Sequence, residues 1–446
     1  MSDQYLDQRK GNKRFSGYFF LLGCAALPFF NDFPLFAKIV PSFRDLPTVF
    51  FILSGLMLLL ESSLDASSIN RNRTDFYFVM GFIFFIWGSL IWNYNSSSQI
   101  CGEKMCGTQR QVSSAISLTA KMIVLLFFIK IVKDKGIHNI SKFVRFGFYM
   151  SLSYVLVELI LLVIPYYLNH QSFVSFDLID NFFHIRENDY GGSRTRGLSF
   201  EPSYQAVYLI ICLPFLLADK KMRRRNINIL AWIVCLLSSL ATTGIVAAIF
   251  FIIFFKYQGR KLFFIITSTV AFIVFFYYLI VSFDLLQLFD IYGTNFASSI
   301  IRSGSWVAGF YAILNNPIFG TGPGMSGYWL VDYYPDFFYL SDYADSWYEL
   351  GKADFDAPTF SSALTFLLEY GLILPVIAAG YLFKKGILQA AFQSKTGRAS
   401  LVSIFVVSFG ISSFQIWGYF LFLAITLAKK WEQFDVLQNQ NLLASK

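Results

Sequence analysis

Eleven apolar segments, most of them long enough to cross a lipid bilayer, follow one another along this 446-residue chain. A bilayer core offers no water to backbone N–H and C=O groups, so each group must be paired inside the protein, which predicts a helix for every segment. With 56% hydrophobic and 14% charged residues, the chain has more apolar surface than a water-soluble protein could bury. The segments are 16–36, 46–61, 76–94, 112–132, 146–168, 202–218, 227–241, 244–255, 262–282, 360–383 and 399–428.

Two of these segments decide the number of spans. Segment 244–255 follows segment 227–241 through Ala241-Thr242-Thr243-Gly244, which predicts a tight hairpin. The last segment, 399–428, would measure about 45 Å as one helix, which is too long for a single span. A hairpin that turns near Ser412-Ser413 gives 12 transmembrane helices, which we favour, and one tilted helix gives 11.

The distribution of Lys and Arg predicts the orientation. If the N-terminus lies in the cytoplasm, alternate connections on that side carry 26 of the 36 basic residues, and those on the other side carry only nine. This asymmetry places the run KKMRRR (220–225) in the cytoplasm. The net charge of +8 therefore reflects topology and contacts with membrane lipid, and we expect no nucleic-acid partner.

We expect a single polytopic domain over residues 1–446 with two large outward loops, at 167–201 and 283–357. Its first apolar segment lacks a cleavable signal pattern and is expected to stay as an anchor. A transporter with a site at the bilayer midplane usually shows internal repeats. The chain shows none, and its polar residues gather in the outward loops, which predicts function at the outer membrane surface.

The second loop interleaves aromatic and acidic residues between positions 328 and 348. Sugars present apolar C–H faces to aromatic rings and hydroxyls to carboxylates, so the mixture suits a neutral or basic glycan. Tyr328, Trp329 and Trp347 are the candidates for sugar contact. Alternatively, the rings form a belt at the membrane surface or the loop's own core.

Isolated arginines stand in both loops. The first loop ends YGGSRTRGLSFEPSYQA (190–206), in which Arg194, Arg196 and Glu201 precede a span, and the second contains Arg302. Arginine is permanently charged, planar and bidentate, which suits it to clamp a lipid-linked phosphate whose charge must be neutralised as its bond breaks. The alternative is an interfacial salt bridge, such as one between Arg196 and Glu201.

The segment that carries Arg302 is typical of an amphipathic helix, with Trp306, Phe310 and Ile313 on one stripe. The sequence Asn315-Asn316-Pro317 predicts the end of this helix. The sequence GTGPG (320–324) then predicts a turn that exposes its backbone.

Four motifs in this order resemble the O-antigen polymerase and ligase family. They are RxRGxxxEPSxxA at 194–206, LSSLATTG at 237–244, RxxxWxxGxxxxxxNPxxGxGxG at 302–324 and LxxLLEYG at 364–371. The resemblance implies an all-α membrane glycosyltransferase that transfers a glycan from a polyprenyl diphosphate carrier at the periplasmic side, without metal, nucleotide sugar or other cofactor. It favours Arg196 and Arg302 as the residues against the diphosphate, with Arg194 assisting and Glu201 as base or orienting group.

The same resemblance separates two branches of the family. Ligases typically carry a His-Asn pair about nine residues before the Glu-x-Gly, where this chain has Pro358-Thr359-Phe360-Ser361-Ser362. We therefore expect a polymerase of undecaprenyl-diphosphate-linked repeat units in the bacterial inner membrane, with a chain-length regulator as a further partner. The alternatives are a ligase and a carrier or flippase, for which only Lys121, Glu158 and Glu369 offer intramembrane charges.

Cys101 and Cys106 lie in a predicted external loop, CGEKMC, where an oxidising periplasm favours a disulfide. Cys24, Cys212 and Cys235 lie in predicted spans and are expected to behave as small apolar residues.

Overall fold

The computed structural model describes residues 15–29, 46–64, 73–103, 105–164, 195, 197–199, 201–219, 222–259, 294–340, 344–355, 357–411 and 413–443. Within these ranges the chain is all-α, and the only strand-like pairing is a bridge between Cys101 and Cys106. The predicted fold class is confirmed at this level. The predicted span at 262–282 lies outside the described residues.

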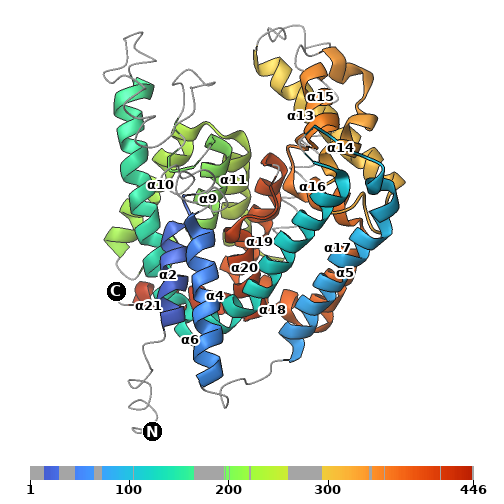
Figure 1. The fold of residues 1–446 in the computed structure, drawn as a ribbon. Coiled ribbons are helices and arrows are strands. Elements are labelled where there is room, and N and C mark those ends of the chain that lie inside the picture. The colour runs from blue at the N-terminus through green and yellow to red at the C-terminus, as the bar shows by residue number, and fades with distance from the viewer. Residues whose placement is uncertain are drawn as a thin grey trace. The chain divides into compact units, whose positions relative to one another are not determined.

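The chain forms two compact units (Figure 1). Unit 1 comprises residues 1–76, 123–241 and 420–446, and unit 2 comprises residues 77–122 and 242–419. The chain therefore passes from one unit to the other inside α5, α6 and α20, and in the turn between α10 and α11.

Unit 1 is a bundle of apolar helices. The amide and hydroxyl of Ser16 both donate to the carboxylate of Glu61, at 3.0 and 2.6 Å, which fastens α2 to α4. Phe20, Phe51 and Phe128 meet in its core, with ring centroids 4.5–5.8 Å apart. Its helices are α2 (Phe15–Ala26), α4 (Leu46–Leu64), the second half of α6 (Gly107–Glu158), η3 (Leu159–Val163), α9 (Pro202–Leu217), α10 (Met222–Ser239), most of α20 (Trp417–Leu427) and α21 (Trp431–Leu443).

Unit 2 holds most of the second predicted outward loop and the helices that support it. Arg398, at the start of α19, donates hydrogen bonds to the carbonyls of Phe254 (3.0 Å) and Tyr257 (3.3 Å), and so caps the C-terminal end of α11. Its helices are α5 (Arg73–Ser98), the first half of α6, α11 (Thr242–Lys256), α13 (Thr294–Asn315), α14 (Ser326–Leu330), η5 (Val331–Tyr333), η6 (Asp336–Leu340), α15 (Ala344–Asp354), α16 (Ser362–Tyr370), α17 (Ile373–Lys384), α18 (Ile387–Gln393), α19 (Lys395–Val407) and η7 (Ser408–Gly410).

Within the described ranges, two helices could cross a membrane by length and composition, at Asp75–Ser98 and Gly107–Glu158. The broken pair α16 and α17 makes a third if it counts as one span, and five shorter apolar helices of 10–17 residues accompany them. These findings fit a membrane protein, whereas the count of 12 spans stays a prediction.

Three helix boundaries test the sequence reasoning. The chain breaks at the predicted turn, since α10 ends at Ser239 and α11 begins at Thr242, and the hairpin itself stays a prediction. The last apolar run is interrupted as expected, between Val407 and Trp417. α6 is two helices that meet at a kink at Gly136 (φ 70°, ψ 160°), which lies in the predicted connection between segments 112–132 and 146–168.

Segment 360–383 is not the single helix that we predicted. α16 and α17 meet at an angle of 105° beside Gly371. Hydropathy alone cannot reveal such a break, because both halves are apolar and only the backbone at the glycine (φ 74°) departs from helix.

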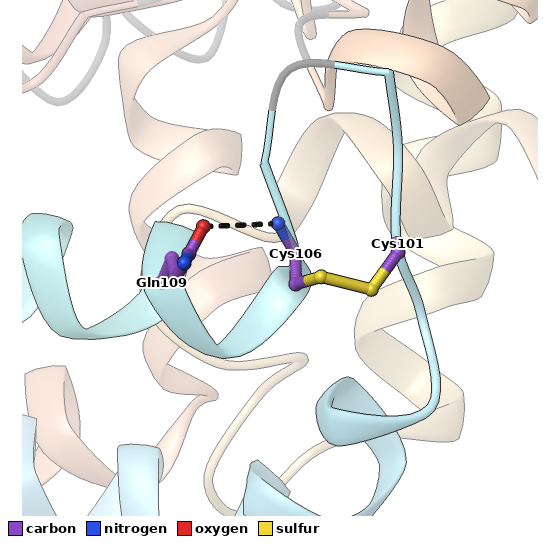
Figure 2. Close-up of a disulfide and its surroundings, with 3 residues drawn as sticks. All are labelled: Cys101, Cys106 and Gln109. Carbon is purple, nitrogen blue, oxygen red and sulfur yellow. Dashed lines mark hydrogen bonds between the residues drawn. A yellow bond between two sulfur atoms is a disulfide. The ribbon is translucent and has the colours of Figure 1, made fainter.

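The Cys101–Cys106 disulfide closes a short loop between α5 and α6 (Figure 2). The amide of Cys106 donates to the side chain of Gln109 at 3.3 Å, and the amide of Glu103 donates to the carbonyl of Ala353, in α15, at 3.0 Å. The predicted disulfide is confirmed, and its loop braces the end of α15.

Candidate functional site

The predicted site residues fall in both units. Arg194 and Arg196 lie outside the described residues. Glu201 belongs to unit 1 and directly precedes α9, and its carboxylate accepts a hydrogen bond from the hydroxyl of Ser203 at 3.1 Å. Arg302, Tyr328, Trp329 and Trp347 belong to unit 2. The proposed salt bridge between Arg196 and Glu201 therefore stays untested.

The described residues of the first loop's end, Thr195 and Gly197–Ser199, form a buried segment that we call the anchor segment. The amide of Thr195 donates to the carbonyl of Ser238 at 3.0 Å, and the hydroxyls of the two residues lie 2.9 Å apart. The amide of Gly197 donates to the carboxylate of Glu158 at 2.8 Å. The structure thus joins the first motif to Ser238 of the LSSLATTG motif and to the end of α6.

A buried polar network of α6 and α9 contacts the anchor segment. Gln205, on α9, exchanges hydrogen bonds with Ser151 (3.0 Å) on α6, and its carbonyl oxygen lies 3.4 Å from the hydroxyl of Ser199. Gly197 has φ +60°, and a Cβ added there would lie 2.6 Å from the same oxygen of Gln205. The segment therefore requires glycine at this position for both its conformation and its space.

In unit 2, Arg302 stacks on an aromatic ring. Its guanidinium lies 5.3 Å from the ring centroid of Phe360, and Trp347 meets the same ring edge-on at 5.9 Å. No carboxylate in the described part of the chain lies within ion-pair distance of Arg302. We call Arg302, Trp347 and Phe360 the arginine stack, in which an aromatic face holds the planar guanidinium.

The backbone around the arginine stack adopts an uncommon conformation. Phe355 and Phe360 both have positive φ, 62° and 51°, which is rare for residues other than glycine and costs on the order of 1–3 kcal/mol each. Such strain clusters at functional sites, where the surrounding structure holds it in place. Phe360 belongs to the stretch 358–362 that occupies the place of the His-Asn pair of ligases, and Phe355 lies just before it.

The helix that carries Arg302 packs through small residues. Ser305, Ala308, Gly309 and Ala312 are buried, and Gly309 lies against Leu364 of α16. Small side chains allow two helices to approach closely. The predicted stripe is therefore only partly right: Ile313 is buried, whereas Phe310 is 55% exposed.

The loop after α13 packs with α13 and α16 around one hydrophobic core. Tyr334 and Phe338 stack with centroids 3.7 Å apart, and Phe338 is fully buried. The core also includes Ile301, Ala308, Ala312, Ile313, Leu330, Val331, Ala357, Leu364 and Leu368. Part of the aromatic content of this loop is thus structural, as the alternative interpretation expected, and Figure 1 shows α13–α16 gathered at one end of the unit.

The three predicted sugar-contacting rings are half-buried. One face of Tyr328 is occupied, since the ammonium of Lys352 lies 3.9 Å from its ring centroid and forms an ion pair with Asp332 at 2.7 Å. Trp329 meets Tyr328 edge-on at 5.3 Å. Trp347 belongs to the arginine stack, and its indole N–H has no hydrogen-bond partner among the described residues.

Acidic side chains gather around Tyr339 on the outer surface of this loop. Burial, then Tyr348, and then the carboxylates of Asp345, Asp332 and Asp336 raise the pKa of Tyr339. Three carboxylates therefore lie near one half-exposed phenol. Lys352 offsets the charge of Asp332, and the field of the other two carboxylates suits a neutral or basic ligand better than an anionic one.

The GTGPG turn closes the break between α16 and α17. The amide of Thr321 donates to the carbonyl of Leu368 at 2.7 Å, and the amide of Gly322 donates to that of Glu369 at 3.2 Å. The amide of Leu372 donates back to the carbonyl of Pro317 at 2.7 Å. The turn is buried, so the prediction that it exposes its backbone is wrong; its amides instead satisfy the carbonyls that the broken helix leaves free.

Sequence reasoning missed the roles of Glu158 and Phe360. The sequence identifies Glu158 only as an intramembrane charge, and nothing in it predicts the left-handed backbone of Phe360. In the described ranges, no three His, Cys, Asp or Glu side chains gather closely enough to hold a metal ion.

No protein-family model matches the chain, and a search of curated proteins found no match.

Proposed function

We propose that the chain is a lipid-linked oligosaccharide polymerase of the bacterial inner membrane. It has about 12 spans and joins undecaprenyl-diphosphate-linked repeat units into an O-antigen-type polysaccharide at the periplasmic face, as a step of lipopolysaccharide biosynthesis. The observation that supports this most directly is the arginine stack: Arg302 is held on Phe360 with no carboxylate beside it among the described residues. A cation that is oriented but not neutralised suits an anionic leaving group.

The reaction is a displacement at the anomeric carbon of the growing chain. A sugar hydroxyl of the acceptor unit, itself lipid-linked, attacks this carbon and forms the new glycosidic bond. The bond to the diphosphate breaks, and the electron pair leaves with the undecaprenyl diphosphate. Arg302 and Arg196, assisted by Arg194, neutralise that charge, and Glu201 takes or orients the proton of the hydroxyl.

The acceptor glycan contacts the aromatic residues of the second loop. Trp347 is the first candidate through the exposed part of its half-buried ring, since its indole N–H is buried. Trp329 offers a second ring, and Tyr328 offers only the face that Lys352 leaves free. The acids around Tyr339 favour a neutral or basic glycan.

The test compares Arg302→Ala and Arg302→Lys with Lys352→Ala in a strain that lacks the native gene, scored by the polymer ladder on a gel and by protein amount. Arg302→Ala should abolish the ladder and leave one repeat unit attached, because the leaving diphosphate loses its counter-charge. Arg302→Lys should restore part, since an ammonium keeps the charge but loses the bidentate fork. Lys352→Ala should keep the ladder, since its charge is already paired with Asp332.

Each alternative gives a different result in this experiment. Loss of all attached glycan in the deletion strain would indicate a ligase, and retention of repeat units on the cytoplasmic side would indicate a flippase. A full ladder in Arg302→Ala at normal protein amount would remove the diphosphate assignment.

A further inference from the structure

Glu158 is a buried carboxylate at the end of α6, with 4% of its surface exposed. Its oxygen accepts the amide of Gly197 at 2.8 Å, and Gly197 directly follows Arg196 in the chain. Glu158 thereby ties the end of α6 to the backbone of the first motif.

The local structure of α6 supports this contact. The helix changes to a π-helix, Leu159–Val163, at the residue after Glu158. Short π-helical segments are frequent at functional sites. The side chain of Gln205 restrains Gly197 from another side, and Ser238 restrains Thr195. Glu158 is the only acidic side chain among these contacts, and it bonds the segment that carries the two arginines of the motif.

We propose that Glu158 is a positioning residue, which holds the backbone of the RTRG segment (194–197) in place for its arginines to act. This inference rests on the proposed function only for the role of the arginines; the contact itself rests on the geometry at Gly197. Glu158 touches no substrate in this proposal and acts through the backbone between Arg196 and Leu198.

The test measures the position of the segment without relying on activity. Trypsin cleaves after arginine, so its rate of cleavage at Arg196–Gly197 in the purified full-length protein reports how often the segment detaches. Glu158→Ala should raise this rate about tenfold or more, because the buried amide of Gly197 is left without its acceptor. Glu158→Gln keeps an acceptor oxygen and should stay near the native rate. Ser153→Ala, an exposed position on the same helix, is the matched control.

The polymer assay on the same variants supplies the second measurement. Glu158→Ala should lower polymer yield per folded protein about 10- to 100-fold, since small displacements of a positioned group have effects of this size. Glu158→Gln should recover most of the yield. Glu158→Asp keeps a buried carboxylate, so the test does not depend on an alanine variant that can simply misfold. Its shorter side chain should give intermediate values in both assays.

The outcomes separate the two proposals. Faster cleavage in Glu158→Ala together with lost polymer, both restored by Glu158→Gln, supports the positioning role. If the wild-type protein makes no polymer but Glu158→Ala is still cleaved faster, the proposed function is overturned and the contact stands. Native cleavage rates in both Glu158→Ala and Glu158→Asp would overturn the positioning role, whatever the polymer assay gives.

Discussion

The anchor segment of unit 1 and the arginine stack of unit 2 hold their surroundings in different ways. Thr195 and Gly197 are fixed by hydrogen bonds from the backbone to Ser238 and Glu158. Arg302 is fixed by an aromatic face and a helix of small residues. Hydrogen bonds depend steeply on direction and distance, whereas ring contacts tolerate small shifts. We infer that a single substitution in the anchor segment should cause a large loss of activity. Substitutions in the arginine stack should cause losses in proportion to the contact area that they remove.

The largest effect should come from the core beneath the arginine stack. Phe338→Ala removes a fully buried ring that packs against Tyr334 and Gly304, and it should lower the free energy of unfolding by about 3–5 kcal/mol. Thermal unfolding of the purified protein measures the change. Tyr339→Ala, at the next position and 48% exposed, is the control and should change the stability much less. Equal effects at both positions would contradict this core.

The anchor segment should show its sensitivity in Gly197→Ala. The added methyl must adopt φ +60° and lies 2.6 Å from the oxygen of Gln205, so we expect about 1–3 kcal/mol of destabilisation and loss of polymer. Gly259→Ala separates the two causes, because Gly259 shares the left-handed backbone (φ +62°) but has open space around it. If Gly197→Ala keeps native polymer length, as the control Gly259→Ala should, the anchor segment tolerates displacement. The proposed difference between the anchor segment and the arginine stack would then be wrong.

The smallest and most graded effect should come from the half-buried rings. Trp347→Ala and Trp329→Ala should each weaken use of the acceptor by about 0.5–1.5 kcal/mol and shorten the polymer, without abolishing the first transfer. Stacking contacts bind substrate and transition state alike, whereas arginines act on charge that develops as the bond breaks. The length distribution per unit of folded protein is the measurement. Unchanged length at unchanged yield in both variants would withdraw the sugar-binding role of this loop.

The sequence predicted elements whose signal is local. Hydropathy found the helices, the small and polar residues at 241–244 found the turn between α10 and α11, and Asn315-Asn316-Pro317 found the end of α13. The break beside Gly371 was not predicted. The GTGPG turn that pairs with it lies about 50 residues earlier, and the carbonyls that this turn satisfies lie in an apolar segment. The buried face of α13 was not predicted either, since close packing selected small residues over the larger Phe310.

The candidate site shows the same division. The motifs singled out Arg302 and the segment around Gly197 by residue type and order. The residues that hold them, Phe360 and Glu158, come from positions 58 and 39 residues away. A single sequence contains no information on which distant side chain meets which backbone amide. Residue chemistry could therefore suggest the groups that act on a substrate, but not those that position them.

The five cysteines have a consequence for experiments on this protein. Cys24, Cys212 and Cys235 are buried, and Cys101 is bonded to Cys106. Under oxidising conditions no thiol is therefore open to a maleimide, and the native chain can itself serve as the parent for single-cysteine variants. A reagent that cannot cross the membrane should then report the side of each introduced thiol directly, in the second loop or in the KKMRRR run, with the brace on α15 left intact.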